Sequence, residues 1–206
     1  MRPRDDFFQE MVAAHFQTRD LEDALAAGDR DAVHAALHDL LLYKAVDPLA
    51  PAALDVIVGV LDLGGRAAAM ALQVMYASAV RQGTLPAERE EAALRIRAAL
   101  GRSGDDRTAV RHALHLLAVL GDAPAVVEQL AHDARRFDGE TVRKEDYLSP
   151  AVAAALGRHD ADLAVLEASL AGRAAEDVRA IREYAQDPDA YEERVRQMQD
   201  DEVEVL

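Results

Sequence analysis

Histidines are the side chains of this sequence best suited to bind a metal ion, because the chain has seven of them and no cysteine. Two pairs have helical spacing: His34 and His38 are one turn apart, and His112 and His115 are neighbours on the same expected helix. Such spacing can place two imidazoles on one metal ion. His34 and His38 flank an apolar stripe and lack the intervening glutamate of a His-Glu-x-x-His zinc site. We therefore interpret both pairs as packing or surface residues and predict no bound metal.

Three His-Asp dipeptides offer a second chemistry, metal-dependent hydrolysis. They are His38-Asp39, His132-Asp133 and His159-Asp160. The order of four residues resembles that of all-helical phosphohydrolases of the HD type, which hold a metal with a histidine, a His-Asp pair and a distant aspartate: His115, His132, Asp133 and Asp160. The spacing is loose, and chance pairs are expected among 38 acidic residues and seven histidines. A metal-dependent hydrolase on a helical bundle is therefore the alternative hypothesis, and the first hypothesis assigns no catalytic residue.

Other chemical patterns are absent from the sequence. The glycines at 64–65 and 101–104 match neither a phosphate loop nor a dinucleotide fingerprint, so no cofactor is predicted. One basic cluster consists of Arg135, Arg136, Arg143 and Lys144, and it is neutralised in sequence by Asp138, Glu140, Glu145 and Asp146. We interpret it as a solvated surface of mixed charge rather than an anion-binding patch.

The chain is strongly acidic, with a net charge of -15 and an isoelectric point near 4.8. A phosphate backbone would repel such a surface, so nucleic acid is not an expected partner. The charge is uneven, because residues 183–206 alone carry -7. This end is interpreted as a solubilising, partly frayed segment; the alternative is a segment that docks on a basic partner.

No segment has the pattern of a membrane anchor or a secretion signal. The first residues include Asp5 and Asp6 where a signal peptide needs apolar side chains. The longest apolar stretch, 67–80, has the length of a buried core helix and is too short to span a bilayer. We expect a cytoplasmic protein without a membrane partner.

Apolar residues recur at helical spacing through most of the chain, and strand-like runs are missing. Glycine, Asp-Gly and Asp-Pro breaks divide the sequence into eleven or twelve expected helices, the last from Asp189 to about Gln199. The segments 67–80 and 110–120 are apolar on almost every side. We therefore expect both to be covered on every side by other helices.

A repeat is visible in the spacing of the expected helices. First helices open near Pro51, Pro86, Pro124 and Ala161, at spacings of 35, 38 and 37 residues. Second helices carry a Val-Arg pair near their start: Val110-Arg111, Val142-Arg143 and Val178-Arg179. This pattern resembles the HEAT family of helical repeats, best at residues 86–121. The resemblance implies a stack of two-helix units in which Arg111, Arg143 and Arg179 tie neighbouring repeats together as scaffold residues.

These observations predict a single all-α domain, residues 1–206, built as a right-handed HEAT-like α-solenoid of stacked antiparallel hairpins. Residues 1–48 form N-terminal capping helices, 49–186 form the repeats, and 187–206 form an acidic helix and tail. The surfaces of stacked repeats usually serve in binding. The sequence therefore predicts a non-catalytic protein–protein interaction module, such as an adaptor, inhibitor or immunity-type scaffold, whose partner is another protein.

Overall fold

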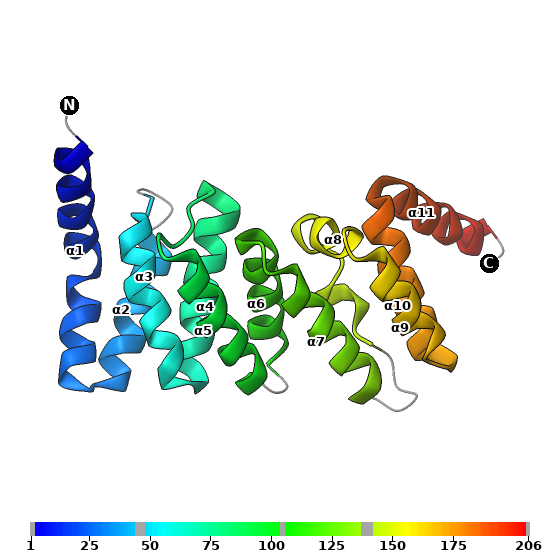
Figure 1. Cartoon of the computed structure of the whole chain (residues 1–206), viewed down its shortest axis with the longest axis horizontal. Coiled ribbons are helices and arrows are strands. Elements are labelled where there is room, and N and C mark those ends of the chain that lie inside the picture. Colours follow the sequence, from blue (N-terminus) through cyan, green and yellow to red (C-terminus); the bar gives the residue numbers. More distant parts are fainter. Residues whose placement is uncertain (1–2, 44–47, 104–105, 137–141, 205–206) are drawn as a thin grey trace. The chain divides into compact units, whose positions relative to one another are not determined.

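The computed structural model describes residues 3–43, 48–103, 106–136 and 142–204 (Figure 1). Within these ranges the chain forms eleven α-helices and no strand, which confirms the all-helical prediction. The helices are α1 Pro3–Ala27, α2 Arg30–Tyr43, α3 Pro51–Val60, α4 Gly65–Gln82, α5 Arg89–Arg102, α6 Arg107–Leu120, α7 Ala123–Arg136, α8 Pro150–Gly157, α9 Asp160–Ala168, α10 Gly172–Gln186 and α11 Pro188–Glu204. Two short 3₁₀ turns, η1 (Leu61–Leu63) and η2 (Lys144–Asp146), complete the described structure.

The helix ends follow from local backbone chemistry. Asp29 caps α2, because its carboxylate accepts from the backbone N–H groups of Asp31 and Ala32 at 3.0 Å. Pro51 occupies the first turn of α3, where its missing N–H is not needed. Gly83 ends α4 in the left-handed conformation, with φ of 66°, which a residue with a side chain adopts at a cost. The breaks expected from the sequence at these three places are therefore confirmed.

The chain divides into two compact units, Met1–Leu116 and Leu117–Leu206, and the boundary falls within α6. In the first unit α1 packs against α2 and α3, α2 packs against α4, and α3 packs against α4 and α5. The core between these helices is aliphatic and includes Leu21, Leu37, Leu54, Ile57, Leu72 and Ile96.

The two segments expected to be covered on every side differ. On α6, Leu114 and Leu117 are fully buried, and so is Leu116 on the opposite side of the helix. This confirms the prediction for those positions. On α4, Leu72 and Met75 are buried, but Val80 is half exposed near the helix end, so complete covering is wrong there.

The second unit is organised around α10. This helix packs against α7, α8, α9, α11 and η2. Fully buried aliphatic residues fill the space between them: Val126, Leu130, Leu156, Leu163, Val178 and Ile181.

One helix start implied by the repeat pattern is wrong. Val142 and Arg143 do not open an α-helix; they precede η2, and the next α-helix begins at Pro150. The reason is local: Pro150 cannot continue a helix from the preceding residues, and Ser149 caps the new one by accepting from the backbone N–H of Val152. The helix expected to open near Pro86 is α5, which begins at Arg89.

The last helix is longer than the sequence indicates. α11 begins at Pro188 and continues past Gln199 to Glu204. The acidic residues near its end, which oppose the helix dipole, do not stop it at the predicted place.

Gly157 marks the close approach of α8 to α10. A Cβ at this position would lie 2.8 Å from the backbone oxygen of Ala185. Gly157→Ala is therefore expected to force the two helices apart and to lower the free energy of unfolding by about 2 kcal/mol, measured by urea denaturation. Gly101→Ala in α5 is the control, because its added methyl group meets nothing within 4 Å. Equal stability of the two variants would contradict this close approach.

Candidate functional site

The His112–His115 pair lies against an aromatic ring. Both histidines are on α6, and Tyr76 is on α4. The rings of His112 and Tyr76 stack with centroids 4.3 Å apart and an interplanar angle of 24°, while His115 meets Tyr76 edge-on at 4.9 Å. His112 is buried, and its Nδ1 has no hydrogen-bond partner. The structure thus brings the two histidines together around Tyr76, a residue that the sequence analysis did not select.

This cluster holds its histidines in the neutral form. Burial lowers the pKa of His112 to about 4, and the positive charge of Arg111 acts in the same direction. Burial also lowers the pKa of His115. Within the described ranges, no group of three or more His, Asp or Glu side chains has the geometry to hold a metal ion. What the described residues of this cluster share is aromatic contact of both imidazoles with the Tyr76 ring.

His34 and His38 face different surroundings although they are one turn apart on α2. His38 is exposed, and its Nδ1 lies 4.0 Å from Asp39. His34 is half-buried, its Nε2 has no partner, and it lines a cavity of about 350 Å³ beside Gly64 at the start of α4. Arg30, Asp31 and Arg66 also line this cavity, and none of them is a nucleophile.

The second unit places the two remaining His-Asp dipeptides in separate polar contacts. Both oxygens of Asp133 are occupied: Gln129 Nε2 donates to one at 2.8 Å, and the hydroxyl of Tyr147 donates to the other at 2.7 Å. Asp133 is buried, whereas His132 is exposed. The dipeptide therefore does not act as a pair, and Asp133 is a structural acceptor.

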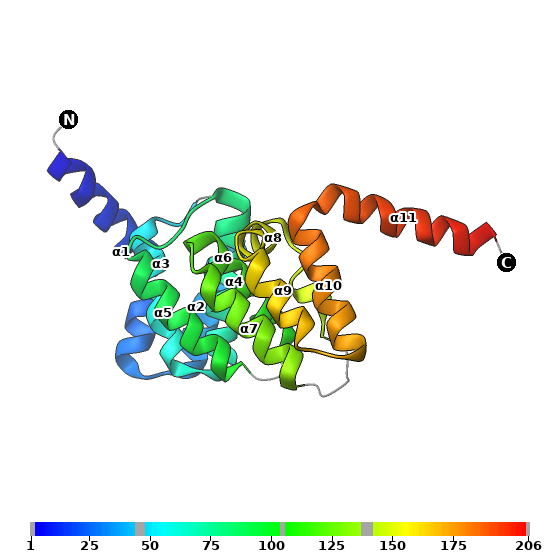
Figure 2. The same ribbon diagram turned by 45° about the vertical axis from the view of Figure 1, so that its right-hand side comes forward.

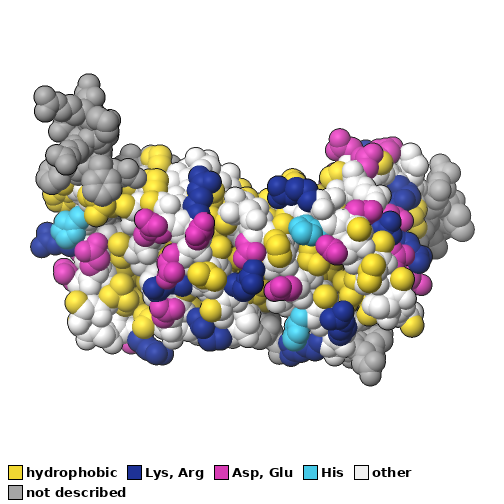
Figure 3. Space-filling model, viewed as in Figure 1, with side chains coloured by type: hydrophobic (Ala, Val, Ile, Leu, Met, Phe, Trp, Pro, Cys, Tyr) yellow, Lys and Arg dark blue, Asp and Glu magenta, His cyan; other side chains and the backbone are white. Residues whose placement is uncertain are grey.

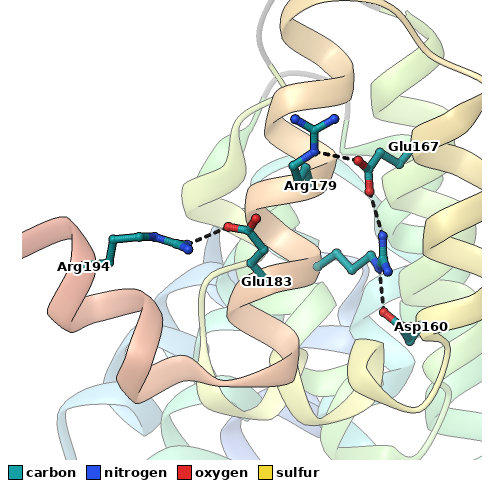
Figure 4. Close-up of polar contacts among 6 residues, drawn as sticks. Asp160, Glu167, Arg179, Glu183 and Arg194 are labelled. Carbon is teal, nitrogen blue, oxygen red and sulfur yellow. Dashed lines mark hydrogen bonds and ion pairs between the residues drawn. The ribbon is translucent and has the colours of Figure 1, made fainter.

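Asp160 belongs to an ion-pair network between α9 and α10, and a separate pair, Arg194 with Glu183, joins α10 to α11 (Figure 4). Arg182 of α10 bridges Asp160 at 2.6 Å and Glu167 at 2.9 Å, both on α9. His159 instead contacts Asp162 at 3.0 Å. Hydrogen bonds from Arg182 and Gln186 hold the pKa of Asp160 below its usual value.

Arg179 takes part in the same network. Its Nε donates to Glu167 at 2.7 Å, and this contact lowers the pKa of the Glu167 carboxyl. Arg179 thus joins α10 to the helix immediately before it. The other two arginines of the Val-Arg pairs are exposed, Arg111 on α6 and Arg143 just before η2.

The basic cluster is spread over α7 and the segment that leads into η2. Arg135 and Arg136 are exposed at the end of α7. Lys144 lies near Asp177 of α10. Burial raises the pKa of Asp177, and the positive charge of Lys144 offsets part of that increase. The acidic residues Asp138 and Glu140 fall outside the described residues.

Large apolar side chains are exposed on several helices. They are Met11, Val12 and Phe16 on α1, Leu42 on α2, Val80 on α4, Leu94 on α5, Val165 on α9 and Met198 on α11. Among these, α1 contributes three within two helical turns, and Phe16 is 75% exposed. Figure 3 shows hydrophobic side chains on the surface at the α1 end of the first unit. Single exposed apolar residues are common, but a group on one helix indicates a surface for contact.

No family model, curated protein or solved structure gives a significant match to this chain. No helix in the described ranges combines the length and the apolar character that crossing a lipid bilayer requires.

Proposed function

We propose that this chain is a non-catalytic protein–protein interaction module, a HEAT-like stack of helical hairpins that serves as an adaptor, inhibitor or immunity-type scaffold in the cytoplasm. Its partner is another protein. It binds through helix surfaces and uses no cofactor or metal.

The helix contacts of the first unit support this proposal. Successive odd-numbered helices touch, α1 with α3 and α3 with α5, and the even-numbered α2 and α4 touch as well. Two parallel rows of this kind are the arrangement in which each hairpin buries its apolar face against the next. Such stacks offer long helix surfaces for binding.

The observation that carries the proposal is a group of exposed apolar residues on α1. This helix packs on α2 and α3 with Leu21 and Ala24, and it leaves Met11, Val12 and Phe16 exposed. A group of exposed apolar side chains on one helix favours a partner that covers them, since covering a phenylalanine contributes roughly 1.5–3 kcal/mol.

The hydrolase alternative has less support from the described residues. It needs carboxylates and imidazoles that are free to hold a metal. Asp133 and Asp160 are instead engaged by hydrogen-bond donors of their own unit.

A pull-down from native lysate tests the α1 surface. The variant Met11→Ser/Phe16→Ser is expected to lose at least tenfold of the captured partner, because the apolar contact is removed while the charge is unchanged. Leu94→Ser on α5 is the matched control, since Leu94 is also exposed, at 62%. Both proteins are expected to melt within a few degrees of the native chain. Equal capture by the double variant and the native protein would contradict an α1 binding surface.

A further inference from the structure

We propose that α11 is an acidic docking helix that lies in an apolar groove on a partner protein, and that lysine and arginine side chains border this groove. This surface belongs to the second unit, and the proposal is independent of the α1 surface.

The first reason is that α11 is longer than the surface that supports it. Its contacts are with α10 (Figure 2): the ring of Tyr191 meets Tyr184 edge-on at 5.5 Å, and Arg194 binds Glu183 at 2.6 Å. Beyond Val195 every side chain of α11 that the structure describes is exposed. Met198 is therefore an apolar side chain left open to water on this helix, and a partner surface that covered it would stabilise the bound state.

The second reason is the pattern of apolar residues on α11. Tyr191, Val195 and Met198 recur at i, i+4 and i+7, which places them on one side of the helix. Tyr191 and Val195 are half-buried, and Met198 is 61% exposed. The stripe thus begins at the contact with α10 and continues past it. Anchors at this spacing are those by which an amphipathic helix fills an apolar groove.

The third reason is charge, and it selects the kind of partner. Both arginines of α11 are already paired, Arg194 with Glu183 and Arg196 with Glu193. The sequence from residue 183 to the end carries a net -7, and acidic side chains gather over the turn between α10 and α11 (Figure 3). Such a helix is repelled by nucleic acid, by an anionic membrane and by the same helix of a second copy. A groove with a basic border complements it.

A synthetic probe of that chemistry tests the proposal. The probe is a fluorescein-labelled helical peptide with leucine at heptad positions a and d and lysine at e and g. Full-length protein is expected to bind it saturably in fluorescence anisotropy at 150 mM salt. Val195→Ser/Met198→Ser is expected to bind at least tenfold more weakly, because the stripe is lost and the charge is kept. Met198→Leu, which keeps an apolar side chain, is expected to bind like the native protein.

The controls distinguish binding through the apolar stripe of α11 from nonspecific attraction between the basic peptide and the acidic protein. Val165→Ser on α9 removes another exposed apolar residue of the same unit, 72% exposed, and is expected to leave binding unchanged. Circular dichroism checks that the double variant keeps its helix content. Equal binding by the double variant, or no saturable binding by the native protein, would overturn the proposal. A native dimer that the double variant converts to a monomer would also overturn it, because the stripe would then be covered by a second copy.

Discussion

Replacing Asp133 by alanine is expected to lower the free energy of unfolding by about 3 kcal/mol, measured by urea denaturation at pH 7. The Asp133 carboxylate is buried and accepts hydrogen bonds from the hydroxyl of buried Tyr147 and from Gln129. Without it, two donors lose their acceptor in a region that water does not reach freely. A buried polar group left without a partner costs about 1–3 kcal/mol.

A control and a double-mutant cycle identify the cause. Asp23→Ala on the exposed face of α1 is expected to change stability by less than about 0.5 kcal/mol. Tyr147→Phe removes the donor, so Asp133→Ala is expected to cost less in that background than in the native protein. Metal analysis of the native protein tests the alternative hypothesis of a metal-dependent hydrolase. If the native protein held one equivalent of metal ion and Asp133→Ala lost it without a loss of stability, Asp133 would be a metal ligand instead.

The helix ends were the most predictable part of this fold. Gly83 and Asp187-Pro188 impose local backbone requirements that do not depend on the rest of the chain, and helices end or begin there. The helix start expected at Val142-Arg143 from the repeat pattern is wrong, whereas α8 begins at Pro150, where the missing N–H is a local requirement. Local chemistry predicted boundaries better than the repeat pattern did.

The contacts of the candidate residues were much less predictable. The pair His112 and His115 was visible from its spacing, but Tyr76 lies on another helix and no periodicity connects it to them. The hydrogen bond from Tyr147 to Asp133 could not be predicted either, because no periodicity in the sequence connects these two residues. Spacing identifies residues on one helix, whereas burial and partner choice depend on how helices pack.

Lowering the pH from 7 to 5 is expected to destabilise the protein by about 2 kcal/mol through His112. Burial lowers its pKa in the folded chain to about 4, against an ordinary value of 6.5. Between these values the unfolded chain binds a proton that the folded chain does not, so stability falls as the pH falls. The contribution is fully present above about pH 6.5 and is lost progressively towards pH 4. The full shift corresponds to roughly 3 kcal/mol.

The charged groups around His112 explain why this loss is assigned to it. Arg111 opposes protonation and Asp106 favours it, but burial is the largest cause. His115 shifts in the same direction, also by burial, and adds to the loss. Asp160 and Glu167 do not contribute to a change in stability between pH 7 and pH 5, because their lowered pKa values keep both carboxylates ionised in that range.

Urea denaturation at pH 7, 6 and 5 measures this effect in the native protein and two variants. His112→Gln cannot be protonated, so its stability is expected to change with pH by at least 1 kcal/mol less than that of the native protein. His38→Gln on α2 is the control for the histidine-to-glutamine substitution itself, because His38 is exposed. If the native protein were equally stable at pH 7 and pH 5, the pKa of His112 in the folded chain would not be lowered, and this prediction would be wrong. An unchanged pH dependence in His112→Gln would assign the loss to other groups.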